Sequence, residues 1–283
     1  MNSILDTYQL ANGVTIPCLG YGTYKAAEGD SATIIKMAID VGYRLFDTAS
    51  FYDTESYLCE AIKESGIARE EFFLTSKVWK AEMGYENTKE AFYRTLNNLG
   101  TNYLDLYLIH WPIPEVGYVL WEELIKDTWK AMEELYQEGK IRAIGLSNFL
   151  PHHIEALLKT ATIMPMVNQL EIHPGYTQEA AVQYCKQHNI LVQAWSPLGR
   201  RRVLEDELLL SLSEKYHVSP ARLCLRYELQ KGILPLPKSS TFSRMKENQD
   251  VFSFIISLED MYRLDTMPQT GWSGEHPDRE RVR

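Results

Sequence analysis

Residues 103–146 read YLDLYLIHWPIPEVGYVLWEELIKDTWKAMEELYQEGKIRAIGL, and the order of patterns in them sets the architecture we expect. The stretch opens with an apolar and aromatic run, YLDLYLI (103–109), and closes with a second one, IRAIGL (141–146). Between them, LIKDTWKAMEELYQEG (124–139) repeats its apolar residues at helical spacing. A strand, a helix and a second strand in this order predict a parallel β-α-β unit.

The same alternation extends along the whole chain. Eight short runs are the predicted strands: CLGYGT (18–23), YRLF (43–46), FFLTS (72–76), YLDLYLI (103–109), IRAIGL (141–146), MPMVN (164–168), ILVQAW (190–195) and ILPLP (233–237). Helical periodicity marks SATIIKMAID (31–40), TKEAFYRTLNNL (88–99), LIKDTWKAMEELYQEG (124–139), HHIEALLKT (152–160), EAAVQYCKQH (179–188) and PARLCLRYEL (220–229). Several have end signals: Asp30 or Ser31 can cap the first, Gly139 ends the third, and Ser219 with Pro220 begins the last.

Eight strand–helix units in 283 residues predict an α/β fold, a (β/α)8 TIM barrel. A doubly wound open sheet is the main alternative, but GYGTYKAAEG (20–29) lacks the G-x-G-x-x-G spacing that such a sheet usually carries. Asn12-Gly13 predicts an N-terminal β-hairpin, because both turn residues tolerate positive φ. No Ser/Gly-rich linker divides the chain, so we expect a single domain over residues 1–283.

The charge balance argues against nucleic acid as a partner. The chain has 29 basic and 38 acidic residues, a net charge of −9, whereas sequence-independent nucleic-acid binding needs clustered cations. No apolar run approaches the roughly 20 residues of a membrane span, and MNSILDTYQL at the start lacks a basic stretch followed by an apolar one. We therefore expect no membrane partner and a cytoplasmic protein. We also expect a monomer, with a dimer left open.

The sequence gives no sign of a metal site. Four cysteines form no cluster with metal-ligand spacing and are expected to be buried free thiols: Cys18, Cys59, Cys185 and Cys224. The pair His152-His153 could suggest a metal, but adjacent residues on a helix point in different directions. We therefore interpret it as a surface helix start behind Pro151.

Polar residues stand at the ends of the predicted strands, where a barrel places its catalytic groups. They are Asp47, Lys77, His110, Ser147-Asn148, Gln169, Ser196 and Lys238. Taken singly, Asp47 could cap a helix, Lys77 could be a solvated loop cation and His110 could be a satisfied core histidine. Taken together with Tyr52, one turn beyond Asp47, these residues are expected to lie close to one another and form one site. His173 follows a strand end before a proline, and we assign it no role.

A family resemblance rests on eight motifs in chain order: LGYGTY (19–24), GYRLFDTASFY (42–52), TSKVW (75–79), YLDLYLIHWP (103–112), IGLSNF (144–149), NQLEIHP (168–174), AWSPLG (194–199) and LPKS (236–239). In these the chain resembles the aldo-keto reductases. The short tail is similar to that of bacterial and protozoan members, such as diketogluconate reductases, methylglyoxal reductases and prostaglandin F synthases. The resemblance implies an NADPH-dependent enzyme that reduces small aldehydes, dicarbonyls or keto sugars.

The resemblance maps the family's catalytic tetrad onto Asp47, Tyr52, Lys77 and His110. Carbonyl reduction needs a hydride at carbon and a proton at oxygen. Tyr52 is the expected general acid, and a phenol of pKa about 10 needs help near neutrality. Lys77 would lower that pKa, Asp47 would hold Lys77 in place, and His110 would orient the substrate carbonyl.

The resemblance also implies the binding residues. Those expected at NADPH are Thr23 and Asp47, then Ser147, Asn148 and Gln169 at the nicotinamide carboxamide, Trp195 as the stacking platform of the ring, Ser196, Leu198 and Arg200 at the pyrophosphate, Lys238, Ser239 and Arg244 at the 2′-phosphate, and Glu247 and Asn248 at the adenine. Those expected at the substrate are Tyr24, Trp79, His110 and Trp111. The C-terminal tail should lie over this pocket, although Trp272 could simply pack on the barrel.

Two other function classes stay open at this point. A non-catalytic, NADPH-binding regulatory subunit would share the fold, but an intact tetrad argues against it. A barrel lyase or aldolase would use Lys77 as a Schiff base. Oxidation of NADPH in the presence of a test aldehyde distinguishes a reductase from the regulatory subunit. Borohydride trapping at Lys77 would identify the lyase or aldolase.

Overall fold

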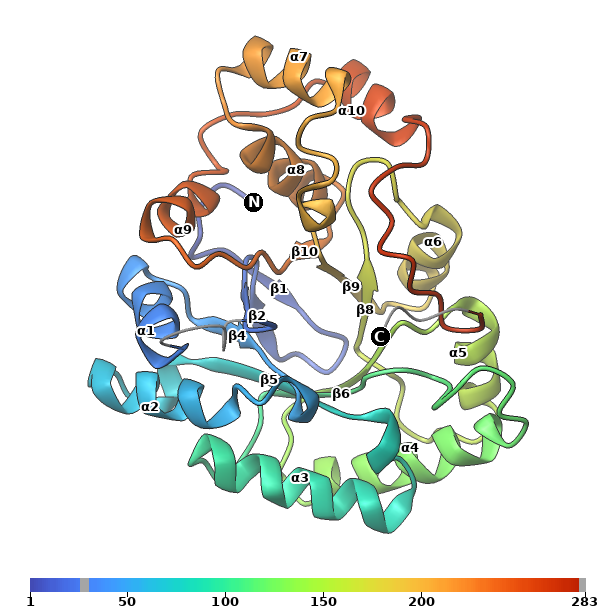
Figure 1. The fold of residues 1–283 in the computed structure, drawn as a ribbon. Helices are drawn as coiled ribbons and strands as arrows, with labels where there is room; N and C mark the ends of the chain where they lie inside the picture. The colour runs from blue at the N-terminus through green and yellow to red at the C-terminus, as the bar shows by residue number, and fades with distance from the viewer. Residues whose placement is uncertain (26–30, 280–283) are drawn as a thin grey trace.

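Eight parallel strands form one sheet in which each strand pairs with the next along the chain (Figure 1). This computed structural model describes residues 1–25 and 31–279. The strands are β3 (Tyr21–Gly22), β4 (Leu45–Asp47), β5 (Phe73–Val78), β6 (Leu106–Ile109), β7 (Ile144–Ser147), β8 (Val167–Glu171), β9 (Leu191–Trp195) and β10 (Leu234–Pro235). Each overlaps one of the eight predicted runs, so the predicted strands are confirmed.

The sheet closes into a barrel where its first and last strands meet. The N–H of Gly20 donates to the carbonyl of Pro235, and that of Gly22 donates to the carbonyl of Pro237, each at 3.1 Å. A side chain at position 20 has no room, because a Cβ there would lie 2.5 Å from the Leu236 side chain. The predicted (β/α)8 fold is thereby confirmed.

One strand begins later than its hydrophobic run suggests. Asp105 interrupts the run YLDLYLI, and its buried carboxylate accepts from Arg69 at 2.8 Å, from Arg142 at 2.7 Å and from the N–H of Leu74 at 2.9 Å. A buried charge needs such partners. The carboxylate therefore ties neighbouring segments together at the amino end of β6.

Helices surround the barrel on the outside (Figure 1). They are α1 (Ser31–Val41), α2 (Glu55–Ser65), α3 (Tyr85–Leu99), α4 (Trp121–Gln137), α5 (Pro151–Leu158), α6 (Glu179–Gln187), α7 (Glu207–Tyr216), α8 (Pro220–Gln230), α9 (Phe242–Gln249) and α10 (Leu258–Asp265). All six predicted helices are confirmed. The Ser219 hydroxyl caps α8 by accepting from the N–H of Arg222, as expected, whereas Asp30 lies outside the described residues.

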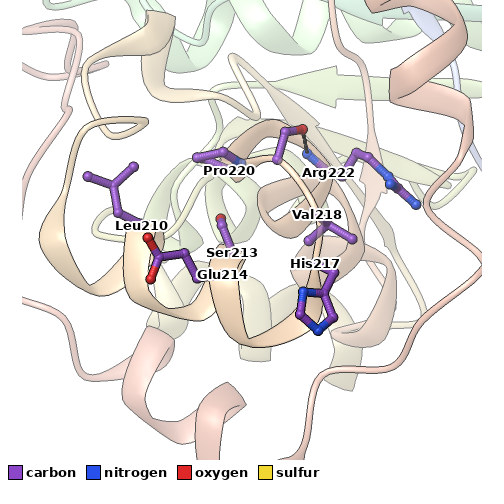
Figure 2. A pocket seen from close by; sticks show the side chains of 8 residues that line it. Leu210, Ser213, Glu214, His217, Val218, Pro220 and Arg222 are labelled. Carbon is purple, nitrogen blue, oxygen red and sulfur yellow. Dashed lines mark hydrogen bonds between the residues drawn. The ribbon is translucent and has the colours of Figure 1, made fainter.

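Two helices, α7 and α10, lie outside the eightfold repeat and were not among those predicted. With α8 they bury a second apolar cluster: Val203, Leu209, Leu212, Leu223, Cys224, Tyr227, Ile256 and Leu264. A surface depression of about 640 Å³ opens between α7 and α8 (Figure 2). Its lining includes Leu210, Glu214 and His217, so it belongs to these outer helices and not to the strand ends.

The predicted hairpin is present as β1 (Thr7–Gln9) and β2 (Thr15–Pro17), which pair antiparallel around a turn with Gly13 at φ +86°. The side chain of Asn12 donates to the carbonyl of Arg142, just before β7, at 2.9 Å. The hairpin therefore lies at the amino ends of the strands and leaves the opposite end for a site. All four cysteines are buried and free, as expected. Within the described residues no helix is both long and apolar enough to cross a membrane.

Glu228 on α8 provides a prediction about stability. It is fully buried, and within the described part of the chain neither carboxylate oxygen has a hydrogen-bond partner. Burial raises the pKa of Glu228 well above its ordinary value. The folded protein therefore holds a proton here that the unfolded chain releases above pH about 4.3, so stability falls as the pH rises from there towards the folded-state pKa.

Replacing Glu228 with methionine, which has a similar size and no charge, should raise Tm at pH about 7 by roughly 3–8 °C. Between pH about 5 and about 8, the Tm of the variant should also fall less than the Tm of the wild type. Thermal unfolding followed by circular dichroism measures both effects. Glu90→Met, at an exposed position on α3, is the control. Equal Tm–pH slopes for Glu228→Met and the wild type would contradict the prediction.

Candidate active site

Four polar side chains meet at the carboxyl ends of three neighbouring strands. Asp47 is the last residue of β4, Tyr52 ends the short 3₁₀ turn that follows it, Lys77 lies near the end of β5, and His110 follows β6. Parallel strands bring their carboxyl ends to one rim of a barrel. The structure thus brings together the four residues that the sequence grouped as a tetrad.

Asp47 and Lys77 form a buried ion pair. Nζ of Lys77 lies 2.5 Å from Oδ1 of Asp47 and 2.9 Å from the carbonyl oxygen of Thr48. Oδ2 of Asp47 accepts from Nε2 of Gln169 at 2.7 Å, and the Thr23 hydroxyl donates to the carbonyl of Asp47 at 3.1 Å. Burial lowers the pKa of Lys77, and the Asp47 carboxylate opposes that fall. The pair is therefore held in one geometry, with Thr23 supporting the backbone of Asp47.

Tyr52 and His110 face each other beside this pair. The Tyr52 hydroxyl lies 3.4 Å from Nε2 of His110. Nζ of Lys77 lies 4.9 Å from the centroid of the Tyr52 ring, so the ammonium group faces the ring. The tyrosine hydroxyl and the imidazole nitrogen are close enough to contact a single oxygen atom at the same time.

The pKa of Tyr52 shifts in the direction opposite to the one expected from the sequence. We expected Lys77 to lower it. Burial instead raises the pKa of Tyr52 well above its ordinary value, and the Asp47 carboxylate adds to the rise. The ammonium of Lys77 is paired with Asp47, and the carboxylate offsets part of its field at Tyr52. Tyr52 therefore keeps its proton at neutral pH, which suits a proton donor.

Asn148, just after β7, links residues at the ends of β6, β7 and β9. Its Nδ2 donates to the carbonyl of His110 at 3.0 Å and to the hydroxyl oxygen of Ser147 at 3.1 Å, and its Oδ1 accepts from Nε1 of Trp195 at 2.8 Å. Asn148 has φ +64°, a left-handed conformation that costs about 1–3 kcal/mol in a non-glycine residue and is common at binding sites. These bonds fix the plane of the Trp195 indole at the end of β9.

The remaining hydrogen-bonding groups fit a nicotinamide carboxamide. The Ser147 oxygen accepts from Asn148, which leaves the hydroxyl hydrogen of Ser147 to donate. Nε2 of Gln169 donates to Asp47 and, at 3.0 Å, to Oε1 of Gln193, which leaves Oε1 of Gln169 to accept. A carboxamide offers one acceptor oxygen and one NH₂ donor group, so one donor and one acceptor from the protein match it.

The segment predicted for the pyrophosphate has a strained backbone. Ser196 has φ +49° and Arg200 has φ +52°, and Leu198 lies between them against the apolar core. The guanidinium of Arg200 pairs with Glu275 at 2.6 Å and lies 5.6 Å from the centroid of the Trp195 ring. The structure therefore places Arg200 against the C-terminal segment as well as beside the proposed nicotinamide platform.

The residues predicted for the 2′-phosphate surround the start of α9. Lys238 and Arg244 are exposed, and across residues 1–25 and 31–279 neither has an ion-pair partner, whereas the Ser239 hydroxyl accepts from the N–H of Thr241 at 3.2 Å. Two unpaired cations beside a helix N-terminus fit a phosphate monoester. On the same helix, Glu247 is half-buried and Asn248 is buried.

Aromatic side chains gather around the tetrad. The ring of Tyr24, 43% exposed, lies 5.0 Å from that of Tyr52, and the ring of Trp79 lies 4.9 Å from that of His110. Phe51 stacks on Trp79 with 3.9 Å between ring centroids. Phe51 was not among the predicted site residues, although its place beside Tyr52 in SFY was a usable signal. Trp111, which was predicted to contact the substrate, is buried.

The C-terminal segment is anchored at the same rim. The Ser273 hydroxyl donates to the buried carboxylate of Glu171 at 2.6 Å, and Glu275 binds Arg200. Trp272 stacks on Tyr176, with ring centroids 6.3 Å apart. Among the smaller electrostatic effects, Glu275 also raises the pKa of Tyr52 and Arg200 lowers it. The segment therefore reaches the strand ends, as expected for the tail.

The interpretation of the two adjacent histidines was wrong in one respect. His153 is buried, and Nε2 of both His152 and His153 approach Oδ1 of Asp278, at 3.2 and 2.7 Å. They converge because Asp278 comes from the C-terminal segment and reaches over the first turn of α5. Nδ1 of His153 accepts from the N–H of Leu150 at 3.1 Å, so Nε2 carries the proton and donates to Asp278. A metal ion would need the lone pair of that nitrogen, so the cluster fits an anchor for the tail better than a metal site.

Known proteins resemble this chain over nearly its full length. The family model described as "Aldo/keto reductase family" matches residues 18–268. The glyoxal reductase of Bacillus subtilis is 48% identical over 277 residues, which cover 98% of each chain. The 9,11-endoperoxide prostaglandin H2 reductase of Trypanosoma cruzi is 42% identical over 98% of this chain and 97% of its own. The structure of a Bombyx mori aldo-keto reductase in complex with NADP superposes with a TM-score of 0.84 at 32% identity, covering 94% of this chain and 92% of that one. From the motifs, the barrel and these matches, the chain belongs to the aldo/keto reductase family.

Proposed function

We propose that this protein reduces small aldehydes and dicarbonyl compounds to alcohols with NADPH. The observation that carries the proposal is the cluster of Tyr52, His110 and the buried Asp47–Lys77 pair at the strand ends. The glyoxal reductase of Bacillus subtilis, 48% identical, supports the choice of substrate class. The aromatic rings of Phe51 and Trp79 beside His110 would give a small, largely apolar entrance.

In the proposed mechanism the bound NADPH supplies the hydride. The residues suited to hold it are Ser147 and Gln169 at the carboxamide, Trp195 at the nicotinamide ring, and Lys238 with Arg244 at the 2′-phosphate. His110 donates a hydrogen bond that orients the substrate carbonyl. Tyr52 transfers its proton to the carbonyl oxygen, where negative charge develops. The Asp47–Lys77 pair keeps a cation near the phenolate that remains on Tyr52.

Tyr52 holds its proton at neutral pH, which is the state that carbonyl reduction needs. A protonated phenol can donate its proton directly to the carbonyl oxygen, whereas alcohol oxidation needs the phenolate as a base.

The buried Asp47–Lys77 ion pair argues against a Schiff-base lyase. Lys77 is held by Asp47 and Thr48, and its side chain is fully buried.

The test of the proposal is NADPH oxidation by the purified protein with glyoxal, methylglyoxal, an aromatic aldehyde and a keto sugar, ranked by kcat/KM. Turnover with the dicarbonyls and aldehydes is the expected result. NADPH binding without turnover of any carbonyl compound would favour the regulatory-subunit alternative. Borohydride-dependent labelling of Lys77 in the presence of an aldehyde would favour the lyase.

The preference for NADPH over NADH should depend on Arg244. Replacing Arg244 with alanine removes a charge-assisted bond to the 2′-phosphate, so NADPH should bind about 10- to 100-fold more weakly while NADH binding stays the same. Quenching of tryptophan fluorescence measures both Kd values. Lys246→Ala, at another exposed position on α9, is the control. If Arg244→Ala kept the wild-type preference, this pocket would not be the 2′-phosphate site.

A further inference from the structure

Gln193 is a fully buried polar side chain that the proposed mechanism has not yet used. It lies in β9, directly opposite Gln169 of β8 in the strand register. It also stands two residues before Trp195, and alternate residues of a strand share one face. Its position is therefore beside the proposed nicotinamide site, one layer deeper in the barrel.

Gln193 completes a chain of polar groups that ends at the catalytic ion pair. Nε2 of Gln169 donates one bond to Oε1 of Gln193 at 3.0 Å and one to Oδ2 of Asp47 at 2.7 Å. An amide nitrogen carries two hydrogens, so both are in use. With its amide turned over, Gln169 would direct an oxygen at two acceptor oxygens. The two acceptors together therefore fix the side of Gln169 that faces outward.

Gln193 is also a costly choice of residue for stability. Its Nε2 is buried and has no hydrogen-bond partner within the described residues. An unsatisfied buried donor destabilises a protein by about 1–3 kcal/mol, and an apolar side chain of the same length would avoid that cost. Packing and stability therefore do not account for a glutamine at this position.

We propose that Gln193 is a positioning residue for hydride transfer, and this inference rests on the proposed function. By accepting from Nε2 of Gln169, Gln193 locks the Gln169 amide with its oxygen directed to the nicotinamide carboxamide. The same bond holds Gln169 against Asp47, so the nicotinamide site and the Asp47–Lys77 pair share one orientation. Gln193 acts through Gln169 and need not touch the cofactor itself.

The variant Gln193→Met keeps the length of the side chain and removes the acceptor. NADPH should bind to it roughly 3- to 10-fold more weakly, because one neutral hydrogen bond no longer holds Gln169 in place. Binding of 2′,5′-ADP, which has the adenosine phosphates but no nicotinamide, should stay within about twofold of the wild type. Unfolding in urea should show Gln193→Met to be at least as stable as the wild type. Kd values from fluorescence quenching or calorimetry need no turnover.

Two further variants separate positioning from general damage to the barrel. Gln193→Glu retains an acceptor oxygen and should restore most of the NADPH affinity. Thr75→Val is the matched control, since Thr75 Oγ1 is buried and without a partner among the described residues, and it takes no part in the Gln193–Gln169–Asp47 chain.

Equal NADPH affinity in Gln193→Met and Thr75→Val would overturn the proposal, and so would an equal loss of NADPH and 2′,5′-ADP binding in Gln193→Met. If the wild-type protein bound NADPH no more tightly than 2′,5′-ADP, the nicotinamide would add no affinity, and the positioning role of Gln193 would be refuted. Tight NADPH binding without carbonyl reduction would instead count against the proposed function and leave these binding comparisons intact.

Discussion

Replacing Tyr52 with phenylalanine should lower kcat by on the order of 10²- to 10⁴-fold and leave the Kd for NADPH within about twofold of the wild-type value. The substitution removes the only hydroxyl in the tetrad, 3.4 Å from Nε2 of His110, and keeps the ring that Lys77 faces. The site would still bind cofactor and substrate, but the carbonyl oxygen would lose its proton donor. Single-turnover reduction of glyoxal by the NADPH-loaded protein measures the chemical step directly.

The matched control for Tyr52→Phe is Tyr24→Phe. Tyr24 lies in the same aromatic group, 5.0 Å away between ring centroids, but it is 43% exposed. Its hydroxyl should be dispensable for the chemical step, so kcat should change by less than about threefold. Similar losses in the two variants, or full turnover in Tyr52→Phe, would remove Tyr52 from the proposed role of general acid.

Replacing Lys77 with methionine should lower the free energy of unfolding by about 3–5 kcal/mol and abolish most of the turnover. The substitution leaves the Asp47 carboxylate buried, 5% exposed, without its cation. Gln169 would still donate one hydrogen bond, which does not replace a charge. Urea unfolding followed by circular dichroism gives the free energy, and the glyoxal assay gives kcat.

The double variant Asp47→Asn/Lys77→Met separates the two effects. Removing both charges should recover most of the lost stability, because no uncompensated charge stays buried. Turnover should stay low, because no cation then stabilises the phenolate of Tyr52. A double variant that regained full turnover would show that the ion pair serves the fold alone, and one as unstable as Lys77→Met would contradict the buried-charge explanation.

The pattern of the sequence predicted the barrel because the relevant forces are local. Each apolar run needs burial on both faces of a parallel strand, and each following helix needs one apolar face. The predicted strand boundaries were less accurate, because contacts with residues far away in the chain decide where a strand begins and ends. The carboxylate of Asp105, inside a predicted strand, is bound by Arg69 and Arg142 from elsewhere in the chain. The interpretation of residues 1–283 as one domain stays a prediction.

The sequence by itself predicted the types and the order of the site residues: a polar group at or just past seven of the eight strand runs, with Tyr52 one turn beyond Asp47. Only the tertiary structure decided how these groups act on each other. Lys77 forms an ion pair with Asp47, and Tyr52 is buried enough for its pKa to rise. Glu275 and Asp278 of the C-terminal segment reach the same rim of the barrel. Gln193 also became visible only there, through its bond to Gln169. The physical reason is that pairing, burial and hydrogen-bond direction depend on distances between residues far apart in the chain, whereas strand and helix patterns depend on neighbours.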